Sequence, residues 1–256
     1  RRQLQVNLKK ALVKDQFSLH FQPQISLTSG RVVGAEALLR WTHPSMGQIS
    51  PGRFLPVAEQ HGDLMIAIGD WVLSRVCHQL RTWQDAGYAP LRISVNVSLV
   101  QLRHDALLKR VSELLKTYQL PADTLQLEIT ESLLMAHFEG AIDRISALKS
   151  SGVDISVDDF GTGYSSLSYL QDLPVDELKI DQSFLKGIIS NHEKKAIVKA
   201  IISLGESLNI RILAEGVEDL LTADYLKENG CEIAQGFLYS KAISPDMFEA
   251  QYLSLH

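Results

Sequence analysis

The sequence is poor in cysteine, and its two cysteines, Cys77 and Cys231, stand far apart. They lack the close spacing that is typical of zinc ligands, and they are too few for a disulfide framework. We therefore expect both to be core thiols in a reducing compartment, and the domain to be cytoplasmic. The sequence also lacks an apolar run of the roughly 20 residues that a transmembrane helix needs. We expect no membrane contact by this domain, whether or not a longer protein is anchored elsewhere.

Positive charge is also scarce, because 25 Lys and Arg residues stand against 30 Asp and Glu residues and give a net charge of −5. This balance argues against a protein that coats a nucleic-acid polymer. It remains compatible with a small anionic ligand that is held through metal ions. The first residue is arginine rather than methionine, and we expect the chain to be a fragment of a longer protein with an upstream regulatory domain.

The sequence does contain short segments in which apolar and polar residues alternate, separated by stretches with helical periodicity. Eight such strands are predicted, at 17–26, 33–40, 92–98, 125–130, 153–159, 177–181, 211–216 and 233–237. Alternating strands and helices are typical of an α/β protein with a mainly parallel sheet. Eight strands in 256 residues favour a modified TIM (β/α)₈ barrel. A doubly wound sheet is the alternative, but no G-x-G-x-x-G follows the first strand.

The first two predicted strands break this alternation, because only a short turn around Gly30 separates them. A hairpin connection makes its two strands antiparallel, so we expect one antiparallel strand in the barrel. Residues 1–16 have a helical pattern, and we expect them to form a linker helix from an upstream domain, with residues 17–256 forming the barrel. Residues 42–52 are predicted to be a loop, and residues 165–171 a short helix.

The polar side of each predicted strand has an unusual composition. In a barrel, the apolar row packs against the helices, so the other row points inward, and barrel enzymes place their chemistry at the carboxyl ends of the strands. The inward row is predicted to contain Gln22, Glu36, Arg40, Asn96, Glu128, Asp158, Lys179, Asp181, Glu215 and Gln235. Any one of them alone is explained as a buried polar residue with a partner, but so many convergent strand ends indicate a functional site.

Five carboxylates dominate this predicted site, namely Glu36, Glu128, Asp158, Asp159 and Glu215. Without compensation, their mutual repulsion and burial would raise their pKa values and destabilise the fold. Divalent cations remove the problem, and an all-oxygen ligand set favours Mg²⁺ or Mn²⁺ over Zn²⁺. Two ions sharing a bridging carboxylate are typical of phosphodiester hydrolysis. Asp158 is suited to be the bridge, since the adjacent Asp159 can then serve the second ion.

The sequence contains seven short motifs in order, namely Glu36-Ala37-Leu38-Leu39-Arg40-Trp41, Asn96-Val97-Ser98, Glu128-Ile129-Thr130-Glu131, Asp158-Asp159-Phe160-Gly161, Leu178-Lys179-Ile180-Asp181, Ala214-Glu215-Gly216-Val217-Glu218 and Gln235-Gly236-Phe237. These motifs and their order resemble those of EAL-domain cyclic-di-GMP phosphodiesterases. The resemblance covers residues from about 10 to 255. Among the departures from the family pattern, Gln24 stands where many members have an aliphatic residue.

This resemblance implies metal-dependent hydrolysis of cyclic-di-GMP to linear pGpG. From the all-oxygen ligand set we also expect Ca²⁺ to inhibit, because it is larger and takes a looser coordination geometry than Mg²⁺. The resemblance further implies that one ion is held by Glu36, Asn96, Glu128 and Asp158, and the second by Asp158 and Asp159 with Glu215 nearby. Lys179 resembles the residue that orients and activates the attacking water. Glu131 resembles the anchor of the loop after Asp159. The implied substrate contacts are Arg40, Gln22, Asp181 and Gln235.

The resemblance also implies a homodimer, formed through the loop Phe160–Ser168 and the helix that follows it. Other readings stay open at this point. The chain could be a non-hydrolysing cyclic-di-GMP receptor or a protein-interaction module. His43 is interpreted as a loop residue, because it has no histidine partner at ligand spacing. Gly161-Thr162-Gly163 is interpreted as a movable gate rather than a phosphate cradle, since the Lys-Ser/Thr tail of a P-loop is missing.

Overall fold

The computed structural model describes residues 2–135, 140–163 and 173–253. Its strands are β1 (Phe17–Ser26), β2 (Val32–His43), β3 (Gly47–Ile49), β4 (Arg92–Asn96), β5 (Leu125–Thr130), β6 (Asp154–Phe160), β7 (Glu177–Ile180), β8 (Arg211–Ala214) and β9 (Ile233–Ala234). The helix predicted at 165–171 and most of the predicted dimerisation loop lie outside the described residues, so both stay predictions.

Eight of these strands close into a barrel, and β3 extends it as a ninth strand beside β2. The pairs from β2 through β4 to β9 are parallel, whereas β1 runs antiparallel to both of its neighbours, β2 and β9. The predicted modified TIM barrel and its antiparallel strand are confirmed. The five-residue connection between β1 and β2 explains the antiparallel strand, because a parallel crossover needs a dozen or more residues.

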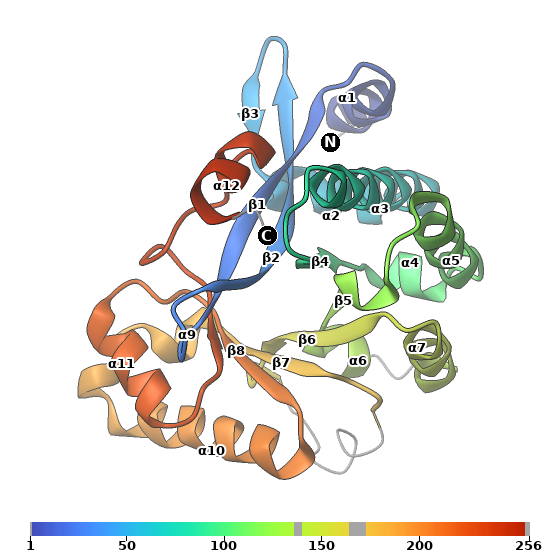
Figure 1. The fold of residues 1–256 in the computed structure, drawn as a ribbon. Helices are drawn as coiled ribbons and strands as arrows, with labels where there is room; N and C mark the ends of the chain where they lie inside the picture. Colours follow the sequence, from blue (N-terminus) through green and yellow to red (C-terminus); the bar gives the residue numbers. More distant parts are fainter. Residues whose placement is uncertain (1, 136–139, 164–172, 254–256) are drawn as a thin grey trace.

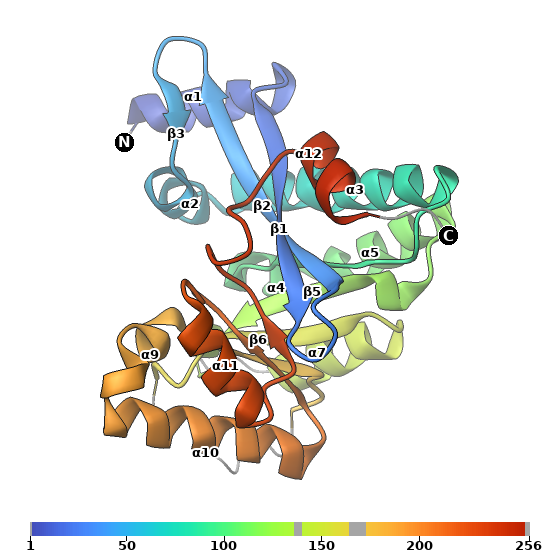
Figure 2. The same cartoon turned by 60° about the vertical axis from the view of Figure 1, so that its left-hand side comes forward.

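Helices surround the strands and follow them along the chain (Figures 1 and 2). The longer ones are α1 (Arg2–Val13), α2 (Pro51–Glu59), α3 (Gly62–Asp85), α5 (Ala106–Tyr118), α7 (Ala141–Ser150), α10 (His192–Leu208), α11 (Leu220–Glu228) and α12 (Pro245–Tyr252), and the short ones are α4 (Leu99–Arg103), α6 (Glu131–Met135) and α9 (Gln182–Leu185). Among these described elements, no helix combines the length and the apolar character required to cross a membrane.

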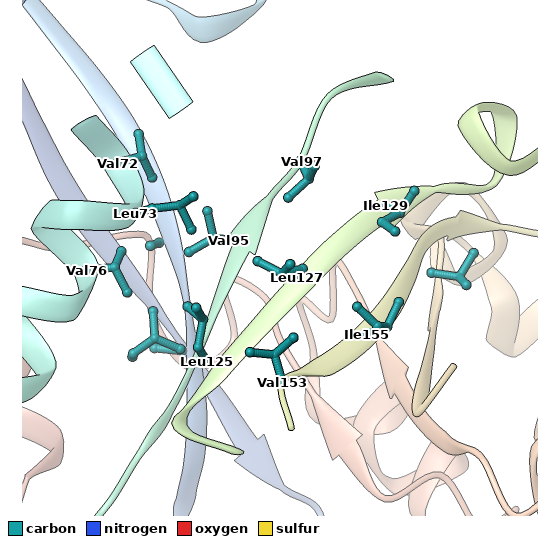
Figure 3. Close-up of a cluster of buried hydrophobic side chains, with 14 of the residues drawn as sticks. Val72, Leu73, Val76, Val95, Val97, Leu125, Leu127, Ile129, Val153 and Ile155 are labelled. Carbon is teal, nitrogen blue, oxygen red and sulfur yellow. The ribbon is translucent and has the colours of Figure 1, made fainter. Parts of the chain in front are cut away.

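The apolar row of each strand packs outward against this helical layer, as the alternation predicts. Figure 3 shows Val72 and Val76 of α3 beside Val95 of β4 and Leu125 of β5. Leu125, Leu127 and Ile129 of β5 are fully buried. Burial of an apolar side chain of this size stabilises the fold by about 1.5–3 kcal/mol. The packing fixes which face of each strand points inward, and so fixes the positions of the polar row.

Two local predictions from the sequence are wrong. Residues 42–52 are not simply a loop, because β2 continues to His43 and the chain turns back into β3, which begins at Gly47 with a φ of 68°. Strand β4 ends at Asn96, and Ser98 instead caps α4 in a capping box with Gln101. A Ser followed three residues later by Gln is the signal for such a cap.

Candidate metal centre

Lys179 of β7 lies at the centre of the acidic site and is completely buried. Its Nζ atom lies 2.6 Å from Glu215 Oε1, 2.9 Å from Glu128 Oε2, 3.4 Å from Glu36 Oε2 and 3.5 Å from Asp158 Oδ1. These carboxylates come from four elements: β2, β5, β6 and the residue that follows β8. The parallel strands bring them together because their carboxyl ends meet at the same end of the barrel.

One lysine cannot neutralise four carboxylates, so the described centre keeps an excess of negative charge. Burial raises the pKa of Glu128 well above its ordinary value, and the neighbouring Glu36 raises it further. Burial also raises the pKa of Glu215 to about 8. Burial alone would lower the pKa of Lys179, but the surrounding carboxylates, Glu128 foremost, raise it well above the ordinary value. Lys179 is therefore a permanent cation.

Glu36 differs from the other carboxylates because two amides donate hydrogen bonds to it. Asn96 Nδ2 lies 2.8 Å from Glu36 Oε1, and Gln235 Nε2 lies 2.7 Å from Glu36 Oε2. Burial alone would raise the pKa of Glu36, yet Lys179 and these two donors hold it below the ordinary value. Glu36 is therefore charged at neutral pH, which is the state that a metal ligand requires.

Asp158 and Asp159 are adjacent, yet both contribute to the mouth of the barrel. Successive residues of a regular strand point to opposite faces, but β6 continues to Phe160 with a register shift between Val157 and Phe160, and Asp159 has a φ of 56°. The strand therefore continues one residue beyond the end that we predicted at Asp159. Carboxylate oxygens of Asp158, Asp159 and Glu215 lie within 4.8 Å of one another. Burial and then Asp158 raise the pKa of Asp159 to about 6.

The hydrogen bonding of the candidate ligand residues also fits divalent cations. Glu128 Oε1 is buried and has no hydrogen-bond donor among the described residues. A buried carboxylate oxygen without a partner is costly, and a cation would satisfy it. All the candidate ligands are oxygen atoms, and such a set favours hard ions such as Mg²⁺ and Mn²⁺. The residues that are present therefore fit the metal sites that the sequence predicts.

Glu131 lies outside the acidic cluster and holds the backbone that leaves Asp159. Its carboxylate is buried, and Oε2 accepts hydrogen bonds of 3.0 Å from the amides of both Gly161 and Gly163. A Cβ atom at Gly163 would lie 3.2 Å from this carboxylate. The close approach explains the glycine, and it connects the end of β5 to the start of the Gly161–Gly163 segment.

The predicted substrate contacts lie at different depths. Gln22 and Gln235 are in the mouth, joined by a 3.1 Å hydrogen bond. Arg40 is half-buried and stands four residues beyond Glu36 on the same face of β2, which is roughly 13 Å along the strand. Asp181 is not part of β7 as predicted, since it caps α9 by accepting a 3.0 Å hydrogen bond from the amide of Ser183.

A cleft of about 290 Å³ opens above Glu36 and Glu215. Two of its lining residues, Leu38 and Gln182, were missed by the sequence interpretation. Leu38 had a signal, because it stands between Glu36 and Arg40 in the same inward row of β2. Gln182 follows β7 in α9, and nothing in its sequence context distinguishes it from other surface residues.

The barrel and its acidic mouth define this protein as a modified TIM barrel with a carboxylate cluster whose geometry fits a metal ion. A family model described as the EAL domain matches residues 5–242. The chain belongs to the EAL-domain family.

Relatives and solved structures agree with this assignment. The chain is 44% identical over 248 residues to the bifunctional diguanylate cyclase/cyclic di-GMP phosphodiesterase MucR of Pseudomonas aeruginosa, covering 97% of this chain and 36% of that protein. It is 41% identical over 241 residues to the cyclic di-GMP phosphodiesterase NbdA of the same species, covering 94% of this chain and 31% of that protein. The chain thus spans about a third of the length of these curated relatives.

The fold is similar to that of a solved structure described as the PaMucR phosphodiesterase in complex with c-di-GMP. The TM-score is 0.91 at 43% sequence identity, and the match covers 96% of this chain and 99% of that one.

Proposed function

We propose that this domain hydrolyses cyclic-di-GMP to linear pGpG with the help of two divalent cations, Mg²⁺ or Mn²⁺. The observation that carries the proposal is the contact of Lys179 with four carboxylates from four different elements. A pure binding module could use neutral residues and avoid the cost of burying so many like charges. The relatives named as cyclic di-GMP phosphodiesterases support the same substrate.

In this proposal, Glu36, Asn96, Glu128 and Asp158 hold one cation, and Asp158, Asp159 and Glu215 hold the other. Bound divalent cations supply a nucleophilic water and neutralise charge on the phosphate. Lys179 orients the attacking water and stabilises the negative charge that develops on the phosphate. Gln22, Arg40, Asp181 and Gln235 hold the substrate over this centre. Glu131 keeps the backbone after Asp159 in place.

Two further parts of the proposal concern assembly. The domain forms a homodimer through the segment that begins at Phe160, and it works under the control of an upstream domain. The second part is supported by the curated relatives, which are about three times longer than this chain. Sedimentation of the purified domain with and without substrate tests the dimer.

The competing function is a receptor that binds cyclic-di-GMP without cleaving it. The deciding experiment incubates the purified domain with cyclic-di-GMP and Mg²⁺ at several protein concentrations and separates the products by chromatography. Formation of pGpG, abolished by Glu36→Ala, is the expected result. Tight binding without product at every concentration would establish the receptor instead, and absence of binding would favour a protein-interaction module.

A further inference from the structure

A layer of uncharged polar side chains lies beneath Glu36 inside the barrel. Gln24 of β1 is fully buried there, and its Nε2 atom lies 3.3 Å from both Ser94 Oγ and Gln235 Oε1. Ser94 in turn donates a 2.7 Å hydrogen bond to Gln126 Oε1. The layer thus joins β1, β4, β5 and the residue after β9, directly under the acidic centre.

The Glu36 carboxylate determines which way the amides of Gln235 and Gln24 must point. The charged Glu36 carboxylate only accepts hydrogen bonds, so Gln235 must present its NH₂ group to it. Gln235 Nε2 lies 2.7 Å from Glu36 Oε2, and its carbonyl oxygen therefore faces Gln24. Gln24 must then present its own NH₂ group to Gln235. The orientation of one buried amide thus depends on the next.

The neighbouring strand is shaped to leave room for Gln24. Gly34 of β2 is its direct cross-strand partner. A Cβ atom at Gly34 would lie 2.5 Å from Gln24 Oε1 and 3.0 Å from the carbonyl oxygen of Arg92. The φ angle of Gly34 lies outside the left-handed region, so the space for Gln24, and not the backbone conformation, explains this glycine.

We infer that Gln24 is a positioning residue for the metal centre, which acts through Gln235. It holds the Gln235 amide with its NH₂ group toward Glu36, and so keeps the Glu36 carboxylate correctly oriented. Without this donor, the carbonyl oxygen of Gln235 loses its Gln24 partner, and the amide is held only through its NH₂ group by Glu36 and Gln22. The inference rests on the proposed role of Glu36 as a metal ligand. Loss of such outer partners of a ligand typically weakens metal binding about 10–100-fold.

The main test compares Gln24→Met with Gln126→Met. Both substitutions remove a fully buried amide from the same layer, but only Gln24 contacts Gln235. We expect Mn²⁺ binding to the metal-free domain, measured by calorimetry, to weaken about tenfold in Gln24→Met and less than about twofold in Gln126→Met. At subsaturating Mg²⁺ the rate should fall in Gln24→Met and recover at saturating Mg²⁺. Equal metal affinity in the wild type and Gln24→Met, or an equal loss in both variants, would overturn the inference.

A second variant reaches the same side chain from across the strand and keeps Gln24 in place. Gly34→Ala should displace the Gln24 carboxamide and weaken Mn²⁺ binding, whereas the same change in a Gln24→Ala background should cost less, because the side chain that it displaces is gone. If Gly34→Ala weakened Mn²⁺ binding equally in the wild type and in the Gln24→Ala background, Gly34 would not act through Gln24, and the inference would be contradicted. A wild-type domain that binds Mn²⁺ but yields no pGpG would refute the proposed hydrolysis while leaving these comparisons valid. A wild-type domain that binds no Mn²⁺ would refute the positioning role together with the metal assignment.

Discussion

Lys179 and Glu215 make the shortest contact of the acidic centre, with 2.6 Å between Lys179 Nζ and Glu215 Oε1. The two residues lie on or directly after neighbouring parallel strands, and the pairing of Ile180 with Ala214 sets their relative height. The same lysine contacts three further carboxylates. In the proposed mechanism this lysine has two separable roles, one in catalysis and one in neutralising the centre before cations bind.

Replacement of Lys179 should separate these two roles. We expect Lys179→Met to lower kcat by about 10²–10³-fold, because a preorganised cation at developing charge is worth that much, with a much smaller change in substrate affinity. The metal-free variant should also melt at a lower temperature than the wild type, and Mg²⁺ should restore part of the difference. Steady-state kinetics measure kcat, and binding of cyclic-di-GMP in the presence of Ca²⁺ measures the substrate affinity. Thermal unfolding with and without Mg²⁺ measures the melting temperature. A defect confined to KM would show that the assigned role is wrong.

The oxygen-rich centre predicts which ions support activity. Mg²⁺ and Mn²⁺ should sustain hydrolysis, and Ca²⁺ should compete with them and inhibit, since it is larger and takes a looser coordination geometry. Rates measured with each ion, and with Ca²⁺ titrated against Mg²⁺, test this. Full activity in excess chelator would contradict the metal-dependent mechanism.

Glu131 should affect the metal centre through the backbone. Glu131→Ala removes the acceptor for the amides of Gly161 and Gly163, so the segment that starts at Asp159 loses its anchor. We expect activity and metal occupancy to fall together, both by about tenfold or more, as expected for loss of a supporting contact. Calorimetry with Mn²⁺ and the pGpG assay provide the two readouts. Normal values in both would reject the coupling between this segment and the metal.

The pH dependence of the metal-free domain should follow the raised pKa values of its carboxyls. The pKa of Glu215 rises from 4.5 to about 8 and that of Asp159 from 3.8 to about 6. Because the folded state binds these protons more tightly than the unfolded state, stability should be highest below pH 4 to 5 with respect to these groups. It should then fall as the pH rises toward 8.

Melting temperatures in chelator between pH 5 and 8 measure this trend, with Glu215→Gln as the control in which it is reduced. Metal binding should strengthen over the same range, since it displaces these protons. A wild-type melting temperature that rises steadily to pH 8 in chelator, and equally in Glu215→Gln, would contradict the assignment.

At the opposite end of the barrel, a substitution should lower the stability of the fold while leaving the catalytic activity unchanged. Glu177 at the start of β7 is fully buried and lies 3.3 Å from Arg92 Nη2 and 3.5 Å from Arg211 Nε. Glu177→Gln should destabilise the fold by about 1.5–3 kcal/mol, because both arginines lose a charged partner and keep only Asp154. Denaturant unfolding measures the loss. At a temperature where the variant is folded, kcat/KM should stay within about twofold of the wild type.

Much of this protein could be predicted from its sequence, because the period-2 alternation of each strand is a local property. This alternation determines which face of each strand points inward. It therefore predicts that Glu36, Glu128, Asp158 and Lys179, each on a different strand, all point into the barrel. The short turn near Gly30 determines the antiparallel hairpin in the same local way. Eight alternating strands then predict the closed barrel, and the order of the motifs predicts the family.

The tertiary structure decided what depends on contacts between distant segments. The register shift in β6 that brings Asp159 beside Asp158 and Glu215 arises from pairing with β7. The link from Gln24 to Gln235 joins residues 211 positions apart. The need for Gly34 follows from the space that Gln24 and the carbonyl oxygen of Arg92 occupy. No local pattern records these relationships, because they depend on how strands pair across the sheet, and the Gln24–Gln235 link also depends on barrel closure, which places β1 beside β9.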